Sequence, residues 1–139
     1  MEVRQLLRNR VPSGGELPPA EWERRHRSLT RLLWLAAGIL AAFSFISGYR
    51  DAHALLHIAA LLPLAFAAAS TKLSRLLRTM ICSVGLLTAA ALGVHVAGGV
   101  TEAHFSFFVV VVLLTVYEDW TVFALAVGYT LLHHGVLGM

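Results

Sequence analysis

The chain divides into a polar first part and a long apolar remainder. The first thirty residues are mostly polar and are interrupted by prolines and glycines. After them, five apolar segments follow with short polar breaks, at 32–48, 52–69, 79–100, 103–117 and 121–137. None of the five shows the two-residue alternation of a half-buried strand, so each segment predicts a helix.

The lengths of these segments suit helices that cross a membrane. A transmembrane helix takes roughly 17–25 residues, and in hydrocarbon only helices and closed barrels satisfy their own backbone polar groups. The segment 103–117 is the shortest, and it spans only where the bilayer thins or the helix ends are anchored. The pattern therefore predicts an all-α, polytopic transmembrane bundle over residues 31–139 with about five spans. Residues 1–30 should form a cytoplasmic arm that ends in a short lead-in helix.

Composition agrees with a membrane protein. The chain is 58% hydrophobic and has a mean hydropathy of +0.72. All eleven Lys and Arg residues lie between Arg4 and Arg78, where they flank the apolar segments. A nucleic-acid surface would need recognition helices or exposed aromatics beside such charge, so we expect no nucleic-acid partner. The single cysteine, Cys82, excludes an internal disulfide and a multi-cysteine metal site, and it is expected in the core.

The basic residues also predict the orientation of the bundle. Only Arg50 lies between the first two segments, whereas seven basic residues flank the other side: Arg24, Arg25, Arg27, Arg31, Lys72, Arg75 and Arg78. By the positive-inside rule, the N-terminus and the loop 70–78 of this multi-pass protein are cytoplasmic. The turn at Tyr49–Asp51 and the stretch Gly98–Glu102 then face outward.

Several residues near the cytoplasmic face have simple structural interpretations. His26 lies among arginines and is expected to be solvated. Tyr117 and Trp120 suit an interfacial aromatic belt. Asp119 is predicted to cap the helix that follows it, with Glu118 beside it favoured by the helix dipole.

The other histidines lie at similar depths in the predicted membrane. They are His53, His57, His95, His104, His133 and His134. With a rise of about 1.5 Å per residue, they come out roughly 20–27 Å above the inner ends of their helices. Four segments therefore bring imidazoles to the outer third of the membrane. Polar groups that titrate are costly at such a place, so their presence there predicts a function.

Spacing along the helices refines this site. His53 and His57 share a helix face, whereas His133 and His134 point about 100° apart, so one of the latter pair should bind and the other should support it. Glu102 precedes His104 by two residues and can ligate or orient an imidazole. The predicted metal-ligand set is thus His53, His57, His95, Glu102, His104, His133 and His134. Within it, one histidine from each segment is expected to hold a cofactor, namely His57, His95, His104 and His134.

The type of ligand stays open at this point. Imidazole with an occasional carboxylate suits copper, iron or zinc. Two imidazoles on facing helices equally suit the axial positions of haem. A single membrane histidine is more often an interhelical hydrogen-bonding residue than a ligand, so the prediction rests on the convergence of several.

The same residues resemble a known kind of protein region. The pattern V-H-x-x-G-G-x-x-E-x-H-F-x-F-F from Val94 to Phe108, then Y-x-D-W and H-H-G, is similar to the histidine-rich, multi-helix membrane input region of bacterial signal-transduction proteins. These include methyl-accepting chemoreceptors, diguanylate cyclases with GGDEF domains and sensor histidine kinases. The resemblance covers roughly residues 20–139.

The resemblance implies a sensory role in the bacterial inner membrane. Such regions have a further, sixth span and carry a signalling module on the cytoplasmic side, and they usually work as homodimers. Five spans leave the C-terminus outside, so this chain is expected to be a fragment or a truncated product. On this interpretation it is not itself an enzyme: it binds a metal or haem through its outer histidines and relays their state to the absent module.

Two other functions fit some of the residues. Histidine pairs occur in membrane di-iron oxygenases, which makes a metal-dependent oxidoreductase the main alternative. Those enzymes repeat a longer His-x-x-His-His pattern, which is absent here. A pH-responsive or proton-conducting bundle is the other alternative, but it would need polar groups through the whole membrane thickness.

Overall fold

The computed structural model describes Gly14 and residues 17–46 and 52–137. This part is helical, with α2 (Pro19–Ile46), α3 (Ala52–Ala69), α4 (Arg75–Val96), α5 (Thr101–Leu114), a 3₁₀ turn η1 (Thr115–Tyr117) and α6 (Trp120–Leu137). The described residues contain no strand, which confirms the all-α prediction for them. Most of the predicted arm and the turn Tyr49–Asp51 lie outside the described residues.

Within the described residues, each predicted apolar segment lies mostly on one helix. The predicted lead-in and the first segment form one helix, α2, which begins at Pro19. Proline suits that first position because the N–H that it lacks has no partner within a helix in any case. The shortest segment forms α5, whose last turn tightens into η1.

Local signals set the two ends of α4. At its start, the Ser74 hydroxyl accepts a hydrogen bond from the backbone N–H of Leu77, at 3.3 Å. At its end, Gly98 and Gly99 both adopt a φ of +75°, which glycine tolerates without steric cost. Gly99 then donates its N–H to the carbonyl of Val94 at 2.9 Å, which closes the helix.

The cap at the start of α4 predicts a modest effect on stability. Replacing Ser74 by alanine removes the hydroxyl that binds the Leu77 N–H, so we expect a loss of about 1 kcal/mol in the free energy of unfolding. The matched Ser74→Asp variant keeps a capping oxygen and should retain the stability. Circular dichroism during denaturant titration measures both variants, and equal stabilities for alanine and aspartate would contradict the capping role.

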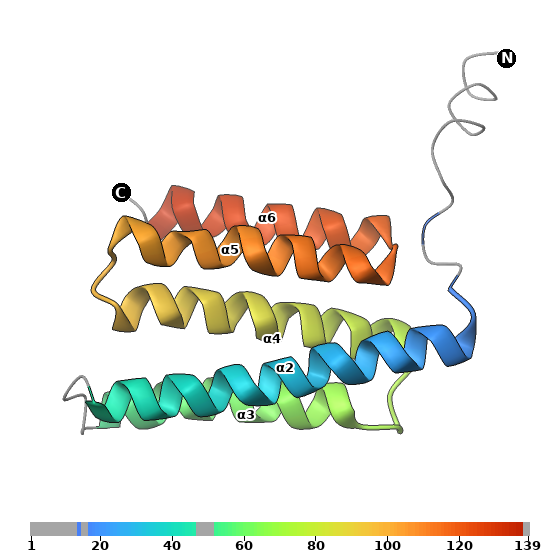
Figure 1. The fold of residues 1–139 in the computed structure, drawn as a ribbon, viewed down its shortest axis with the longest axis horizontal. Coiled ribbons are helices and arrows are strands. Elements are labelled where there is room, and N and C mark those ends of the chain that lie inside the picture. Colours follow the sequence, from blue (N-terminus) through green and yellow to red (C-terminus); the bar gives the residue numbers. More distant parts are fainter. Residues whose placement is uncertain (1–13, 15–16, 47–51, 138–139) are drawn as a thin grey trace, which may run out of the picture.

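The five helices in the described part run alternately up and down (Figure 1). Helix α4 lies between the α2–α3 pair and the α5–α6 pair, and it packs against all four of them. One end of the bundle contains the start of α2, the link between α3 and α4, and η1. Following the predicted orientation, we call it the inner end, and we call the opposite end the outer end.

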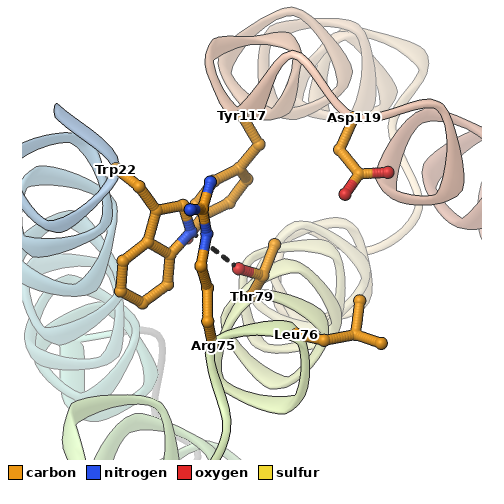
Figure 2. Close-up of a pocket in the computed structure, with 6 residues that line it drawn as sticks. All are labelled: Trp22, Arg75, Leu76, Thr79, Tyr117 and Asp119. Atoms are coloured by element: carbon orange, nitrogen blue, oxygen red, sulfur yellow. Dashed lines mark hydrogen bonds between the residues drawn. The ribbon is translucent and has the colours of Figure 1, made fainter. Parts of the chain in front are cut away.

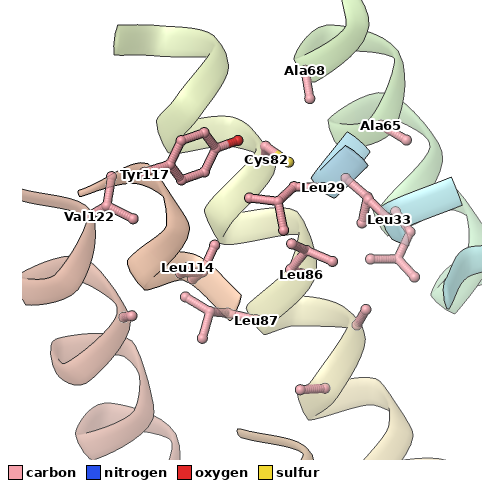
Figure 3. Packing of buried hydrophobic residues seen from close by; sticks show 14 of the residues in the cluster. Leu29, Leu33, Ala65, Ala68, Cys82, Leu86, Leu87, Leu114, Tyr117 and Val122 are labelled. Atoms are coloured by element: carbon pink, nitrogen blue, oxygen red, sulfur yellow. The ribbon is translucent and has the colours of Figure 1, made fainter. Parts of the chain in front are cut away.

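Buried apolar side chains from every helix form one core around α4. Leu33 of α2, Leu87 of α4 and Leu114 of α5 are fully buried within it (Figure 3). Cys82 is fully buried in the same cluster, which confirms its expected place in the core. Gly85 permits the close approach of α2 and α4, because a Cβ built at this residue would lie 2.7 Å from Leu33 Cδ2.

The helices differ in how well they meet the requirements for crossing a membrane. Among the described residues, α2 and α4 are long and apolar enough to do so. The stretches Ala59–Ala69 and Thr101–Tyr117 are apolar but shorter. Large apolar side chains are nevertheless exposed on α2, α5 and α6, including Ile46, Phe108 and Leu132. The structure thus supports a helical bundle with two candidate spans, and the prediction of five spans goes beyond it.

Candidate functional site

The topology brings the backbone positions of the six predicted histidines to the outer end. His57 of α3 and His95 of α4 face each other there, with ring centres 5.2 Å apart and planes nearly perpendicular at 87°. His57 is buried. The side chain of His53 lies outside the described part of the chain. The structure therefore joins α3 and α4 through one histidine pair.

A second histidine group lies between α5 and α6. The ring centre of His104 is 5.2 Å from that of His134 and 6.3 Å from that of His133. Phe107, which is fully buried, contacts both α6 histidines, with ring centres 4.6 Å from His133 and 5.3 Å from His134. His133 and His134, predicted to diverge, are themselves 5.4 Å apart at their ring centres.

Backbone hydrogen bonds fix the tautomers of two of these imidazoles. The Nδ1 atom of His104 lies 3.1 Å from the carbonyl oxygen of Val100, and that of His134 lies 2.8 Å from the carbonyl oxygen of Thr130. A carbonyl can only accept, so each Nδ1 carries the proton and donates it. The Nε2 atom of the neutral ring then keeps its lone pair, as a metal-binding histidine requires.

The remaining members of the predicted ligand set are less engaged. The Nδ1 atom of His133 is buried and has no hydrogen-bond partner among the described residues. Glu102 is exposed in the first turn of α5. Within the described ranges, no three His, Cys, Asp or Glu side chains are arranged to hold a metal ion. The histidines thus form two groups, one on α3 and α4 and the other on α5 and α6.

The inner end contains a buried polar network that centres on His26. This residue is 1% exposed, so the expectation that it is solvated is wrong. Its Nε2–H donates to the carbonyl oxygen of Ala68 at 2.9 Å, and its Nδ1 accepts from the hydroxyl of Tyr117 at 2.7 Å. Tyr117 is also fully buried rather than part of an interfacial belt. One imidazole therefore ties α2 to the end of α3 and to η1.

Trp22 extends this network toward α4. Its indole stacks on His26 with ring centres 4.6 Å apart and an interplanar angle of 10°. The indole N–H donates to the hydroxyl of Thr79 at 3.0 Å. The guanidinium groups of Arg75 and Arg78 lie 5.2 Å and 5.0 Å from the centre of the indole. Such cation–π contacts are attractive because the ring face is negative.

Ion pairs surround this buried network at the surface of the inner end. Arg25 binds Glu21 and Glu118 at 2.6 Å each, and it also donates to the carbonyl oxygen of Val116 at 2.7 Å. Arg24 and then Arg25 lower the pKa of the Glu21 carboxyl by donating hydrogen bonds to it. In turn, hydrogen bonds to Glu118 and Glu21 raise the pKa of Arg25. These charges therefore stay ionised around neutral pH.

Glu118 and Asp119 form the link from η1 to α6. Glu118 is a non-glycine residue with positive φ, at 52°, and Arg25 binds its side chain there. The carboxylate of Asp119 accepts a hydrogen bond from the N–H of Thr121 at 2.8 Å, which confirms its predicted capping role. The Asp119 side chain also borders a cavity beside Trp22 and Arg75 (Figure 2).

Sequence reasoning missed His26 and Trp22 as structural residues. They are spaced i, i+4 and so share one face of α2, but they lie in the strongly charged stretch EWERRHR. The i, i+4 repeat of a tryptophan and a histidine, with Leu29 and Leu33 further along the same face, was the available signal for their burial.

Comparison with known proteins gives one informative match. The chain is similar to the Transducer protein Htr8 of Halobacterium salinarum, with 35% identity over an alignment of 141 positions. The alignment covers 93% of this chain and 22% of that protein. The chain therefore spans about a fifth of the length of this relative. No family model and no solved structure matches the chain.

Proposed function

We propose that this chain is the membrane-embedded signal-input region of a receptor. The observation that carries the proposal is the similarity to a transducer protein, which extends over 93% of this chain but only 22% of the relative. A region of that extent fits one input part of a longer signalling protein. The cytoplasmic output module, of the chemoreceptor, kinase or GGDEF type, belongs to this proposal and lies outside the chain.

The proposed setting is a multi-pass bundle with a cytoplasmic N-terminus. Helices α2 and α4 are long and apolar enough to span a membrane. The other three helices, α3, α5 and α6, coincide with predicted spans and expose large apolar side chains. The basic residues of the α3–α4 link and of the start of α2 share the inner end, in line with the positive-inside rule. We include five spans and a homodimer in the proposal.

The proposed stimulus is a transition metal ion or haem at the outer histidines. An Nε2 ligand lies about 2.0 Å from its metal, so two imidazoles on one tetrahedral ion have ring centres roughly 5 Å apart. His57 and His95 match that spacing at 5.2 Å, as do His104 and His134. Imidazoles on opposite faces of a haem lie further apart, at roughly 6 Å. Copper, iron or zinc therefore fits these pairs better, with Glu102 and His53 as further members of the proposed ligand set.

The proposed relay runs through α4. A ligand that binds two arrangements of the bundle with different affinity shifts the population between them. His95 lies near the outer end of α4, and Arg78 near its inner end binds Glu23 of α2 at 3.2 Å. A movement of α4 at the histidines would therefore reach the ion pair with α2 at the inner end.

The test is a metal analysis and a visible absorption spectrum of the purified chain in lipid nanodiscs. We expect bound transition metal or haem, and each of the variants His57→Ala, His95→Ala, His104→Ala and His134→Ala should lose the part that its own histidine group holds. Lys72→Gln is the control, because this exposed residue lies in the α3–α4 link at the inner end. A wild-type chain that neither contains nor takes up metal or haem would contradict the proposed ligand, while leaving the receptor relationship in place.

A further inference from the structure

A cavity of about 280 Å³ opens at the inner end, far along the bundle from the histidine groups. It lies between the starts of α2, α4 and α6 (Figure 2). The residues that line it are Trp22, Arg75, Leu76, Thr79, Tyr117 and Asp119. Pockets for drug-sized ligands measure roughly 300–1,000 Å³, so this one suits a smaller molecule.

Two oppositely charged side chains, Arg75 and Asp119, line the cavity, and neither forms an ion pair with a described residue. Arg75 donates one hydrogen bond, from Nη1 to the carbonyl oxygen of Leu17 at 2.8 Å, and a guanidinium has five N–H donors. Asp119 accepts at Oδ1 from the N–H of Thr121. Within the described part of the chain, neither residue forms an ion pair, whereas the neighbouring Arg25 and Arg78 both do.

The other polar groups of the cavity wall are already engaged. The Tyr117 hydroxyl donates to His26, and the Thr79 hydroxyl accepts from the indole of Trp22. The indole ring of Trp22 is stacked on His26 and contacted by two guanidinium groups. An aromatic cage for a quaternary ammonium group would need free ring faces. The guanidinium of Arg75 and the carboxylate of Asp119 are therefore left to recognise a ligand.

We propose that this cavity binds a small zwitterion, with an anionic phosphate-type group on Arg75 and a primary ammonium on Asp119. Guanidinium binds phosphate oxygens through paired hydrogen bonds, and a carboxylate accepts from a primary ammonium. The cavity lies at the bundle end that is proposed to meet the cytoplasmic surface, where an ethanolamine phospholipid headgroup and free phosphoethanolamine share this chemistry. The site does not involve the outer histidines, so its test is separate from the test of the proposed metal or haem.

The first experiment titrates the chain with soluble compounds by calorimetry, in nanodiscs that lack ethanolamine lipids. O-phosphoethanolamine should bind, and phosphocholine should bind about tenfold more weakly or worse, because its quaternary ammonium cannot donate a hydrogen bond to Asp119.

Asp119→Asn and Arg75→Gln should each weaken phosphoethanolamine binding by about tenfold, the loss of one charge-assisted contact. Asparagine still caps α6, so Asp119→Asn tests the charge without removing the cap. Lys72→Gln, in the exposed α3–α4 link, is the matched control and should leave binding unchanged.

The second experiment identifies the source of the ligand. Native mass spectrometry of the chain from nanodiscs of mixed ethanolamine, choline and glycerol phospholipids should show retention of the ethanolamine lipid if the headgroup is the natural ligand. Binding of only the soluble compound assigns the site to a free zwitterion. Binding of neither overturns the proposal. A loss of affinity in Arg75→Gln alone, with Asp119→Asn unchanged, overturns it as well, because that result describes a plain anion site.

Discussion

A His26→Ala variant should lose roughly 3 kcal/mol of its free energy of unfolding. The change leaves a cavity at a fully buried position and removes the indole's stacking partner. It also takes away the Nδ1 acceptor of the buried Tyr117 hydroxyl, which then keeps only the Cys82 thiol, a weak hydrogen-bonding partner. Circular dichroism during denaturant titration in mixed micelles measures the loss.

A double-mutant cycle separates the hydrogen bond from the cavity. Tyr117→Phe removes only the hydroxyl and should cost about 1–2 kcal/mol, and His26→Ala should cost less in that background than in the wild type. Arg24→Ala is the control on the same helix, because its salt bridge is exposed and should change stability by about 0.5 kcal/mol or less. Strictly additive losses in the cycle would show that the two side chains do not act together.

Gly85→Leu should also cost roughly 3 kcal/mol, through steric conflict between α2 and α4. A Cβ at this residue would lie 2.7 Å from Leu33 Cδ2 and 3.2 Å from Leu33 Cδ1. Leu33 is fully buried, so its side chain has no free space to move into. Thermal unfolding followed by circular dichroism detects the change.

Two further variants test that explanation. Leu33→Ala should destabilise the wild type but partly restore the Gly85→Leu variant, because it vacates the space that the new side chain needs. Gly38→Leu, on the exposed face of α2 with nothing within 4 Å of the added Cβ, should be neutral or slightly stabilising. Equal costs for leucine at positions 85 and 38 would exclude the close approach as the cause.

The sequence predicted the helices and the end of the bundle at which the histidines lie. Apolar segment length fixes how many residues separate a histidine from the turn, and helical rise converts that count into depth. The structure places His57, His95, His104 and His134 near one end accordingly. Helix rotation is not fixed in this way, because it depends on which faces pack. The division of the histidines into an α3–α4 pair and an α5–α6 group could therefore be seen only in the packed bundle.

The partners within the inner network could not be predicted from the sequence for a different reason. His26 and Tyr117 are 91 positions apart, and they meet only because η1 folds back against the start of α2. In a local window, His26 is surrounded by arginines and glutamates, which made solvation the natural expectation. The capping role of Asp119 was predictable because it involves only the backbone two residues further on.

The continuous course of α2 has a mechanical consequence. This helix of 28 residues is about 42 Å long, and Leu33, at its midpoint, is wedged against Gly85. If α2 tilts about this central contact, its two ends move in opposite directions. A tilt of about 5° would shift each end by about 2 Å, and it would shift Trp22, about 16 Å from Leu33, by about 1.4 Å. That is enough to break the hydrogen bond from Trp22 to Thr79.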